Sequence, residues 1–251
     1  MYNDYNNDRF QTSQTNPANP AEQTSSLTAQ DINRYMAKVY GWMFFGLVIT
    51  AVFCFLMQTM LPANRASAMQ TYGVITLVCF IGQMFIVFRL SRGLQKLSAP
   101  SATVMFIIFS ALNGVWLSYV FLIYASAQIV VAFAMCAVMF GVMSLFGLAT
   151  KQDLTSFGRL AMVGLIGIIV VSLINMFIGS SGLDFLVCII GLVIFLGLTA
   201  YDAQKIRGMY MHIAPQGDQI VAVSAIQGAL SLYLDFINIF LFILRLLGRR
   251  S

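Results

Sequence analysis

The sequence predicts an all-α membrane protein with seven transmembrane helices. Of its 251 residues, 59% are hydrophobic and only 9% are charged, whereas about 25% of the residues of a soluble domain are charged. Apolar runs close to the ~20 residues that a helix needs to cross a bilayer recur along the chain. Strands would leave their backbone polar groups unpaired in lipid, so we expect these runs to be helices. The composition argues against a soluble enzyme, a secreted disulfide-bonded domain and a nucleic-acid-binding protein.

Short polar segments divide the apolar part of the chain into seven predicted spans. These comprise residues 39–61, 71–90, 99–122, 127–149, 160–178, 185–201 and 221–247. The break between the third and fourth spans, at residues 124–126, is so short that it predicts a tight hairpin of two helices.

Residues 1–30 differ in composition from the rest of the chain. Sixteen of them are Asn, Gln, Ser or Thr, and Pro17 and Pro20 interrupt any regular pattern. A segment this poor in apolar side chains does not bury enough surface to offset its ordering entropy, so we expect a disordered polar tail. A partner protein or a protease could bind such a tail, although the simpler interpretation is a solvent-exposed leader segment that binds nothing. Residues 31–251 then form the seven-helix transmembrane domain.

Basic residues predict the orientation of the chain. Alternate segments outside the spans carry them: Arg34, Lys38, Arg89, Arg92, Lys96, Lys151, Arg159, Lys205 and Arg207. The three other breaks between spans contain Arg65 alone. Because positively charged loops stay in the cytoplasm, we expect a multi-pass protein with a cytoplasmic N-terminus. Seven crossings place Arg249 and Arg250 outside, so the last span either crosses against this rule or is partly re-entrant; we favour crossing.

Residue types that hold metals or carry out hydrolysis are scarce. The four cysteines stand singly in apolar runs, so neither a disulfide framework nor a zinc site is expected. The single histidine, His212, falls in a predicted loop. One imidazole there provides neither a His-rich metal site nor a base for a buried serine. We therefore expect no cofactor and no enzymatic activity.

One acidic residue, Asp235, stands well inside an apolar run. A carboxylate at that depth costs at least ~2.5–3.5 kcal/mol on insertion scales, so it must face protein or water and needs a partner. Spacings of three and four residues place it on one helix face with Ser224, Gln227, Ser231 and Asn238. Such a polar stripe either joins packed helices by hydrogen bonds or lines a path for water, and the ionisable group keeps the second interpretation open.

The other acids of the apolar region fall at the ends of spans or in breaks. Asp202 ends the sixth predicted span close to Lys205, and taken alone it is an interfacial residue. Asp153, Asp184 and Asp218 lie in breaks, where we expect solvated or helix-capping side chains. Nothing in the spacing alone shows that Asp202 approaches the acid of the seventh span.

Two strings resemble the signatures of the Bax inhibitor-1 family. GLTAYDAQK at residues 197–205 contains Asp202, and ALSLYLDFIN at residues 229–238 contains Asp235. YGWM at 40–43 and MSLFG at 143–147 support the likeness. The resemblance runs from about residue 31 to the C-terminus, and the polar leader with the short basic end is most similar to the bacterial inner-membrane branch.

The resemblance implies both a fold and a function. In this family two layers of three helices surround a central seventh helix, and members are described as pH-sensitive calcium leak channels. Asp202 and Asp235 correspond to the two motif aspartates, which form a pH-sensing pair. An arginine of the second span is described as a latch for the sixth-span aspartate; Arg89 is the best-placed match, and Arg92 is a rival. The implied partners are the lipid bilayer of the bacterial inner membrane and the calcium ion.

The proposed chemistry of the aspartate pair is physically reasonable. Like charge and desolvation disfavour a second negative charge in a poorly hydrated site, so two adjacent carboxylates titrate as a unit. Gain of a proton removes a charge that holds a cation, and this change is able to shift the packing of the last helix. For a weakly and transiently held calcium, the expected ligands are Asp202, Asp235, Asn238 and backbone carbonyls. Gln227 and Ser231 would lie along the same path.

Other functions compete with the channel. Tyr201-Asp202 fits half of the signature of an intramembrane aspartyl protease, but LYLD at 232–235 lacks the glycine of the other half. A secondary transporter could use an acid pair, yet no inverted repeat of glycine-broken spans is evident. The main alternative is a non-conducting regulator that binds other inner-membrane proteins, such as a protease or a translocon, and the polar tail suits that function.

Overall fold

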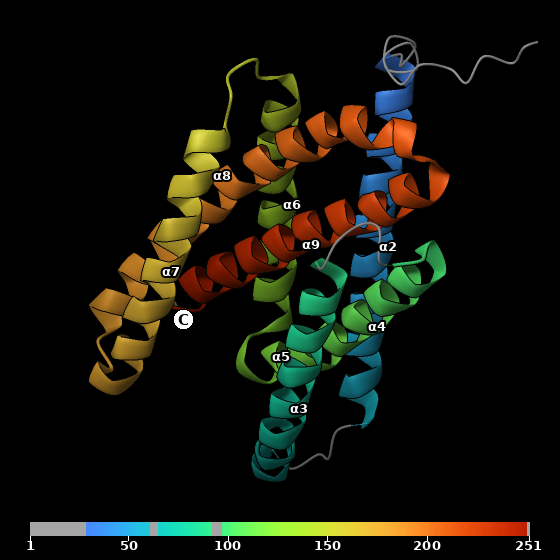
Figure 1. Ribbon diagram of the computed structural model, residues 1–251. Coiled ribbons are helices and arrows are strands. Elements are labelled where there is room, and N and C mark those ends of the chain that lie inside the picture. The colour runs from blue at the N-terminus through green and yellow to red at the C-terminus, as the bar shows by residue number, and fades with distance from the viewer. Residues whose placement is uncertain (1–28, 61–64, 92–96, 250–251) are drawn as a thin grey trace, which may run out of the picture.

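The structure, a computed structural model, describes residues 29–60, 65–91 and 97–249. Every regular element in these ranges is a helix (Figure 1). The helices are α2 (Ala29–Met60), α3 (Arg65–Ser91), α4 (Ala99–Leu117), α5 (Val120–Ile123), α6 (Ser126–Ala149), α7 (Thr155–Ile178), α8 (Ser181–Ile213), the short 3-10 helix η2 (Ala214–Gln216) and α9 (Asp218–Gly248). Of the predicted tail, residues 1–28 lie outside the described residues, and the last two residues begin α2.

Six segments of the described chain are long and apolar enough to cross a membrane. They are Ala29–Met60, Ala99–Ile123, Ser126–Ala149, Thr155–Ile178, Ser181–Gln216 and Asp218–Gly248. The 27 residues of α3 would exceed a ~30 Å hydrocarbon core at ~1.5 Å per residue. Its described apolar stretch is the shorter Leu77–Leu90, however. The all-helical fold is confirmed, whereas the seventh crossing, at α3, stays a prediction.

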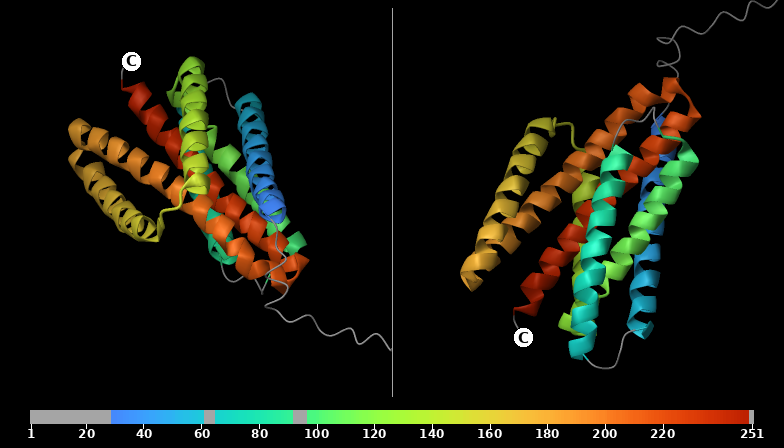
Figure 2. Two further views of the ribbon diagram at one scale, coloured as in Figure 1. Left: turned by 90° about the horizontal axis from the view of Figure 1, so that it is seen from above. Right: turned by 60° about the horizontal axis from the view of Figure 1, so that its bottom comes forward.

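The helix α9 lies at the centre of the bundle. It runs obliquely between the other helices in all three ribbon views (Figures 1 and 2), and it packs against α2, α4, α6 and α8. Side chains on every side of it are buried, which agrees with the predicted central position of the last span. The helix α7 instead packs mainly on α8 and has few buried residues, so it belongs to the edge of the bundle.

Two glycines allow helices to meet backbone to backbone. A Cβ atom on Gly147 of α6 would lie 2.1 Å from the carbonyl oxygen of Ala200 in α8, and one on Gly114 of α4 would lie 2.4 Å from that of Thr50 in α2. Such close crossings increase the packing contacts that hold helices together in a membrane, where lipid removes the usual hydrophobic drive. The first crossing also fixes the part of α8 that precedes Asp202.

The helix α8 extends further than predicted. The expected end of the sixth span at residues 201–202 is wrong, because the helix continues to Ile213 and carries Asp202 in its interior. After Asp202 the helix keeps one apolar face, with Ala203 and Ile206 buried, and turns its basic residues outward. This amphipathic extension explains why hydropathy alone ended the span too early. His212 therefore lies in the last turn of α8 and not in a loop.

The positions of the turns agree with the sequence-based prediction better than the ends of the helices do. The predicted hairpin at 124–126 is confirmed, since α5 ends at Ile123 and α6 begins at Ser126. Between α7 and α8, Gly179 adopts a left-handed conformation with φ of 67°, which glycine tolerates without strain. Ser180 then caps α8 by accepting a hydrogen bond from the backbone N–H of Leu183.

The loop between α6 and α7 is tied to α8. The side chain of Gln204 accepts from the N–H of Leu154 (2.9 Å) and donates to the carbonyl of Gln152 (2.7 Å). Within the loop, hydrogen bonds from Thr155 hold the pKa of the exposed Asp153 below its usual range. The predicted capping function of Asp153 agrees with this contact, because it accepts from the backbone N–H at the start of α7.

Candidate functional site

Asp235 is enclosed in the middle of the central helix. Only 5% of the residue is exposed, and it is the one charged residue among the buried side chains of the described chain. Its Oδ2 atom finds no hydrogen-bond partner among the described residues. The predicted burial of Asp235 is confirmed. A buried carboxylate oxygen without a partner is costly, yet the partner expected for this oxygen is not found among the described residues.

The other members of the polar stripe have different surroundings. Ser224 hydrogen-bonds the hydroxyl of Tyr35 in α2 (2.8 Å), and Gln227 donates to the backbone carbonyl of Leu90 in α3 (2.5 Å). These two contacts join helices, as the packing interpretation expects. Asn238 donates to the carbonyl of Leu234 in its own helix (2.7 Å), so this bond does not join helices.

A polar cavity of about 260 Å³ lies between α3, α8 and α9. Asp202 and Lys205 line it from α8, and Gln227 and Ser231 line it from α9. Asp202 is half-buried there. The cavity thus gathers three polar residues of the two sequence motifs, together with Gln227 of the polar stripe, at one place.

The structure brings the two motif aspartates into electrostatic contact. Asp202 in α8 and Asp235 in α9 lie on helices that pack on each other, close enough for their charges to interact. Asp235 itself does not line the polar cavity, whereas its helix neighbours Ser231 and Leu234 do. One acid therefore faces an open space and the other lies behind it within the packed bundle.

The cation beside Asp202 is Lys205, one turn along the same helix. Lys205 acts electrostatically on Asp202, and its Nζ atom also lies 5.5 Å from the centre of the Tyr201 ring. Arg89, the predicted latch, has an exposed side chain on α3, and no described ion pair joins it to Asp202. Arg92, its rival, lies outside the described residues. The latch stays a prediction.

Sequence reasoning missed a buried hydroxyl pair next to Asp235. Tyr233 is completely enclosed and its hydroxyl lies 2.6 Å from Oγ1 of Thr50 in α2. Oγ1 of Thr50 also donates toward the carbonyls of Gly46 (2.9 Å) and Ser110 (3.0 Å). Because a threonine hydroxyl has a single proton, we assign that proton to a carbonyl and the Tyr233 proton to Thr50. No periodic signal marks this contact, since both residues read as ordinary members of apolar spans.

The acids provide few metal ligands. The described residues contain no group of three His, Cys, Asp or Glu side chains that could hold a metal ion. Calcium binds six to eight oxygen atoms, so Asp202 and Asp235 would need carbonyls or water to complete a site. This donor set suits brief contact with a passing ion better than tight binding.

A bundle of apolar helices with one carboxylate buried in its central helix and a second at a polar cavity defines a polytopic membrane protein with an internal acidic site. Residues 32–251 match the family model described as inhibitor of apoptosis-promoting Bax1. The chain therefore belongs to the Bax inhibitor-1 family, as its two aspartate motifs predict.

The relatives of the chain are bacterial proteins of similar length. The inner membrane protein YbhL of Escherichia coli K12 is 43% identical over 222 residues, which cover 87% of this chain and 93% of the relative. A protein of Borreliella burgdorferi is 44% identical with the same coverage. One of Rickettsia prowazekii is 38% identical over 88% of this chain and 92% of its own length. With the apolar helices, these findings support a multi-pass location in the inner membrane.

Proposed function

We propose that this protein is a pH-sensitive calcium leak channel of the inner membrane, gated by Asp202 and Asp235 and without enzymatic activity. The observation that carries the proposal is the unpartnered Oδ2 atom of Asp235 in the most central helix, beside a second carboxylate at a polar cavity. An internal acid of this kind marks an ion or proton path by default. The family resemblance of both motifs points to the same function.

The gating step follows from the electrostatics of the pair. Asp202 and Asp235 disfavour each other's ionised form, so uptake of one proton is shared between them. The change in charge alters the attraction to Lys205 and to any cation in the cavity, and α9 then repacks between two arrangements.

Few other titratable groups face the pair. Beside Asp235, α9 itself contributes the enclosed Tyr233, and α6 contributes Cys136, whose thiol contacts the carbonyl of Phe236 (3.3 Å); Tyr35 of α2 lies about three helical turns away at Ser224. The sequence of α4 contains no Asp, Glu, Lys, Arg, His, Tyr or Cys. The charge of the site is therefore set by the two aspartates and Lys205, and Arg89 would join them if the predicted latch forms.

Calcium flux into proteoliposomes tests the proposal. We expect flux through the full-length protein to change with pH, and we expect Asp235→Asn to flatten that dependence because the pair loses its shared proton. Asp218→Asn, at the exposed start of α9, is the matched control and should keep the native pH profile. An Asp235→Asn profile identical to the native one would overturn this mechanism.

The alternative function is a regulator that binds other inner-membrane proteins without conducting ions. The observation in its favour is α7, which packs mainly on α8 and exposes apolar side chains over most of its surface. Deletion of residues 1–28 separates the two functions. Calcium flux that survives this deletion supports the channel. Absence of flux at every pH in the native protein, together with loss of a bound partner protein after the deletion, supports the regulator.

A further inference from the structure

A second polar pocket lies at the end of the bundle where α9 finishes. Its volume is about 390 Å³, and it is lined by residues of the α5–α6 turn, the start of α8 and the last turn of α9. Asp184, at the start of α8, is 18 residues from Asp202, or ~27 Å along the helix at ~1.5 Å per residue. This pocket is therefore separate from the acidic site.

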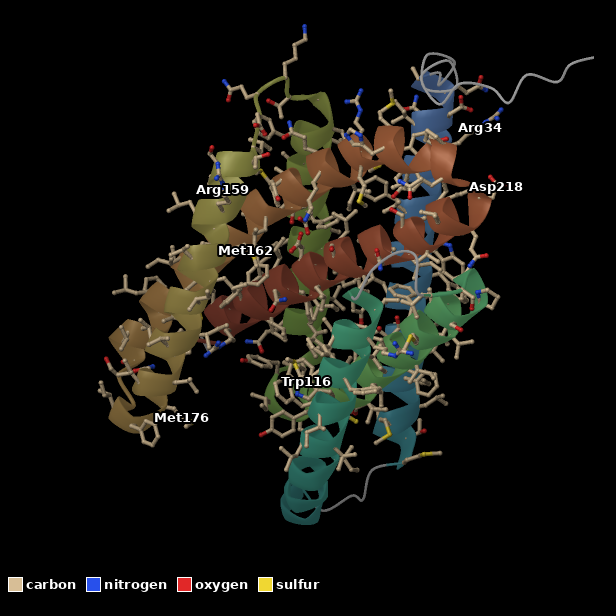
Figure 3. All side chains as sticks on the ribbon, viewed as in Figure 1. Arg34, Trp116, Arg159, Met162, Met176 and Asp218 are labelled. Atoms are coloured by element: carbon tan, nitrogen blue, oxygen red, sulfur yellow. The ribbon has the colours of Figure 1, made fainter. Side chains whose placement is uncertain are left out.

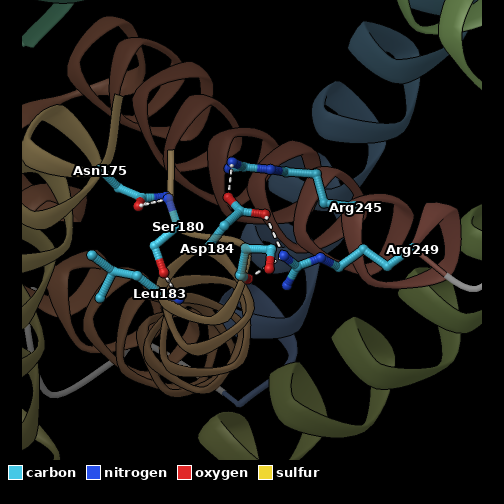
Figure 4. Close-up of polar contacts among 7 residues, drawn as sticks. Asn175, Ser180, Leu183, Asp184, Arg245 and Arg249 are labelled. Carbon is cyan, nitrogen blue, oxygen red and sulfur yellow. Dashed lines mark hydrogen bonds and ion pairs between the residues drawn. The ribbon is translucent and has the colours of Figure 1, made fainter. Parts of the chain in front are cut away.

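Two arginines and one carboxylate form the wall of the pocket (Figure 4). Arg245 lies 2.6 Å from Oδ1 of Asp184, and Arg249 lies 3.5 Å from Oδ2 of the same residue. Arg249 also donates to the carbonyl of Ser181. Asp184 is therefore ion-paired, whereas the sequence predicted a solvated or helix-capping side chain. With two guanidinium groups and one carboxylate, the cluster carries a net charge of one positive unit.

The remaining donors of this cluster point to an anion. The side chain of Arg245 is 45% exposed, so the single bond to Asp184 uses only part of its five N–H groups. Tyr124 and Gln128, the second of which accepts a hydrogen bond from the backbone N–H of Ala125, also line the pocket. Two helix N-termini, those of α6 at Ser126 and α8 at Ser181, add partial positive charge nearby.

The position of the pocket selects the kind of anion. It lies where α8 begins and α9 ends, and both helices are among the candidate membrane spans, so it sits at the level of the lipid head groups. Basic pockets between transmembrane helices bind anionic head groups at the cytoplasmic face, and the same charge-assisted pairing of guanidinium with phosphate applies at the opposite face, where the predicted topology puts this pocket. We propose that this pocket, formed by Tyr124, Gln128, Asp184, Arg245 and Arg249, binds the phosphate ester of an anionic phospholipid.

The proposal also accounts for an irregularity of the sequence. Arg249 and Arg250 oppose the predicted orientation of the last span if it crosses the membrane. Asp184 neutralises part of this charge within the fold, and a lipid phosphate neutralises the rest. The guanidinium groups thus serve as interfacial anchors.

Lipid binding by the full-length protein in detergent tests the proposal. Native mass spectrometry measures retention of phosphatidylglycerol against phosphatidylcholine, with inorganic phosphate as a competitor. We expect preferential retention of phosphatidylglycerol and at least a tenfold loss of affinity in the double variant Arg245→Gln and Arg249→Gln. Arg159→Gln is the matched control, because Arg159 is also exposed but lies at the far end of α7 from the α7–α8 turn (Figure 3).

A second variant separates binding from folding. Asp184→Asn removes the carboxylate that competes with phosphate, so we expect a severalfold increase in phosphatidylglycerol affinity, whereas a purely structural ion pair predicts none. Circular dichroism confirms that each variant keeps its helices. Equal retention of both lipids by the native protein, or displacement of phosphatidylglycerol by inorganic phosphate at equal concentration, would overturn the assignment to a lipid.

Discussion

Tyr233 and Thr50 show how a single contact fixes the register of the central helix. Their hydroxyl groups join α9 to α2 two residues from Asp235, and the Tyr233 ring packs edge-on against Phe106 and Phe109 of α4. The contact is buried on all sides, so its loss is not repaired by solvent. It therefore holds the acid of α9 at a defined place between the helices.

We predict that the two ways of breaking this contact have unequal costs. Tyr233→Phe removes one hydrogen bond while Thr50 keeps its backbone acceptors, which destabilises the protein by about 0.5–1.5 kcal/mol. Thr50→Val leaves the enclosed Tyr233 hydroxyl without an acceptor, which costs about 1–3 kcal/mol. Thermal unfolding in detergent, followed by circular dichroism, measures both. A larger loss for Tyr233→Phe would contradict the assigned direction of the hydrogen bond.

The residues of the site differ in how well their place in it can be predicted from the sequence. Asp235 is visible because a carboxylate inside an apolar run has few physical explanations. Lys205 is close to Asp202 in the sequence, but only the continuation of α8 past Asp202 places the two residues on one helical turn. Thr50 and Tyr233 carry no signal, because a contact between residues 183 positions apart depends on how the helices cross.

At the level of helices, hydropathy predicted where spans occur better than where helices stop. Glycine and short polar breaks marked the turns at residues 124–126 and 179 correctly. The end of α8 was missed because the helix continues as an amphipathic segment after its apolar stretch. Helix length outside the apolar core depends on tertiary packing, which a hydropathy pattern does not contain.

The crossing of α6 and α8 should depend on Gly147. We predict that Gly147→Ala destabilises the protein by about 1–3 kcal/mol, because the added methyl group overlaps the backbone of Ala200 and forces the helices apart. Gly141→Ala in the same helix is the control, since no atom lies within 4 Å of its added Cβ. We expect that control to be neutral or stabilising by up to ~1 kcal/mol, as alanine favours helix. Similar unfolding midpoints for both variants would exclude a tight crossing.

For the whole molecule, the ends of α8 define the two faces of the bundle. Lys151 lies in the loop tied to the later part of α8, and Gly182 lies in its first turn. The four native cysteines are buried, so single added cysteines can be labelled above a low background.

We predict opposite labelling of these two positions. Lys151→Cys should react with a membrane-impermeant thiol reagent from the cytoplasmic side, because basic loops stay in the cytoplasm. Gly182→Cys should react from the other side. Intact cells and inverted vesicles provide the two directions of access. Labelling of both positions from one side would contradict a full crossing by α8.

The close crossing at Gly147 gives α8 a pivot. Ala200 is held against α6 there, and Asp202 lies only two residues beyond it. Asp184 is 16 residues away on the other arm, or ~24 Å at ~1.5 Å per residue. A rigid tilt of the helix about this point would move Asp202 little and Asp184 much further, in proportion to their distances from Ala200.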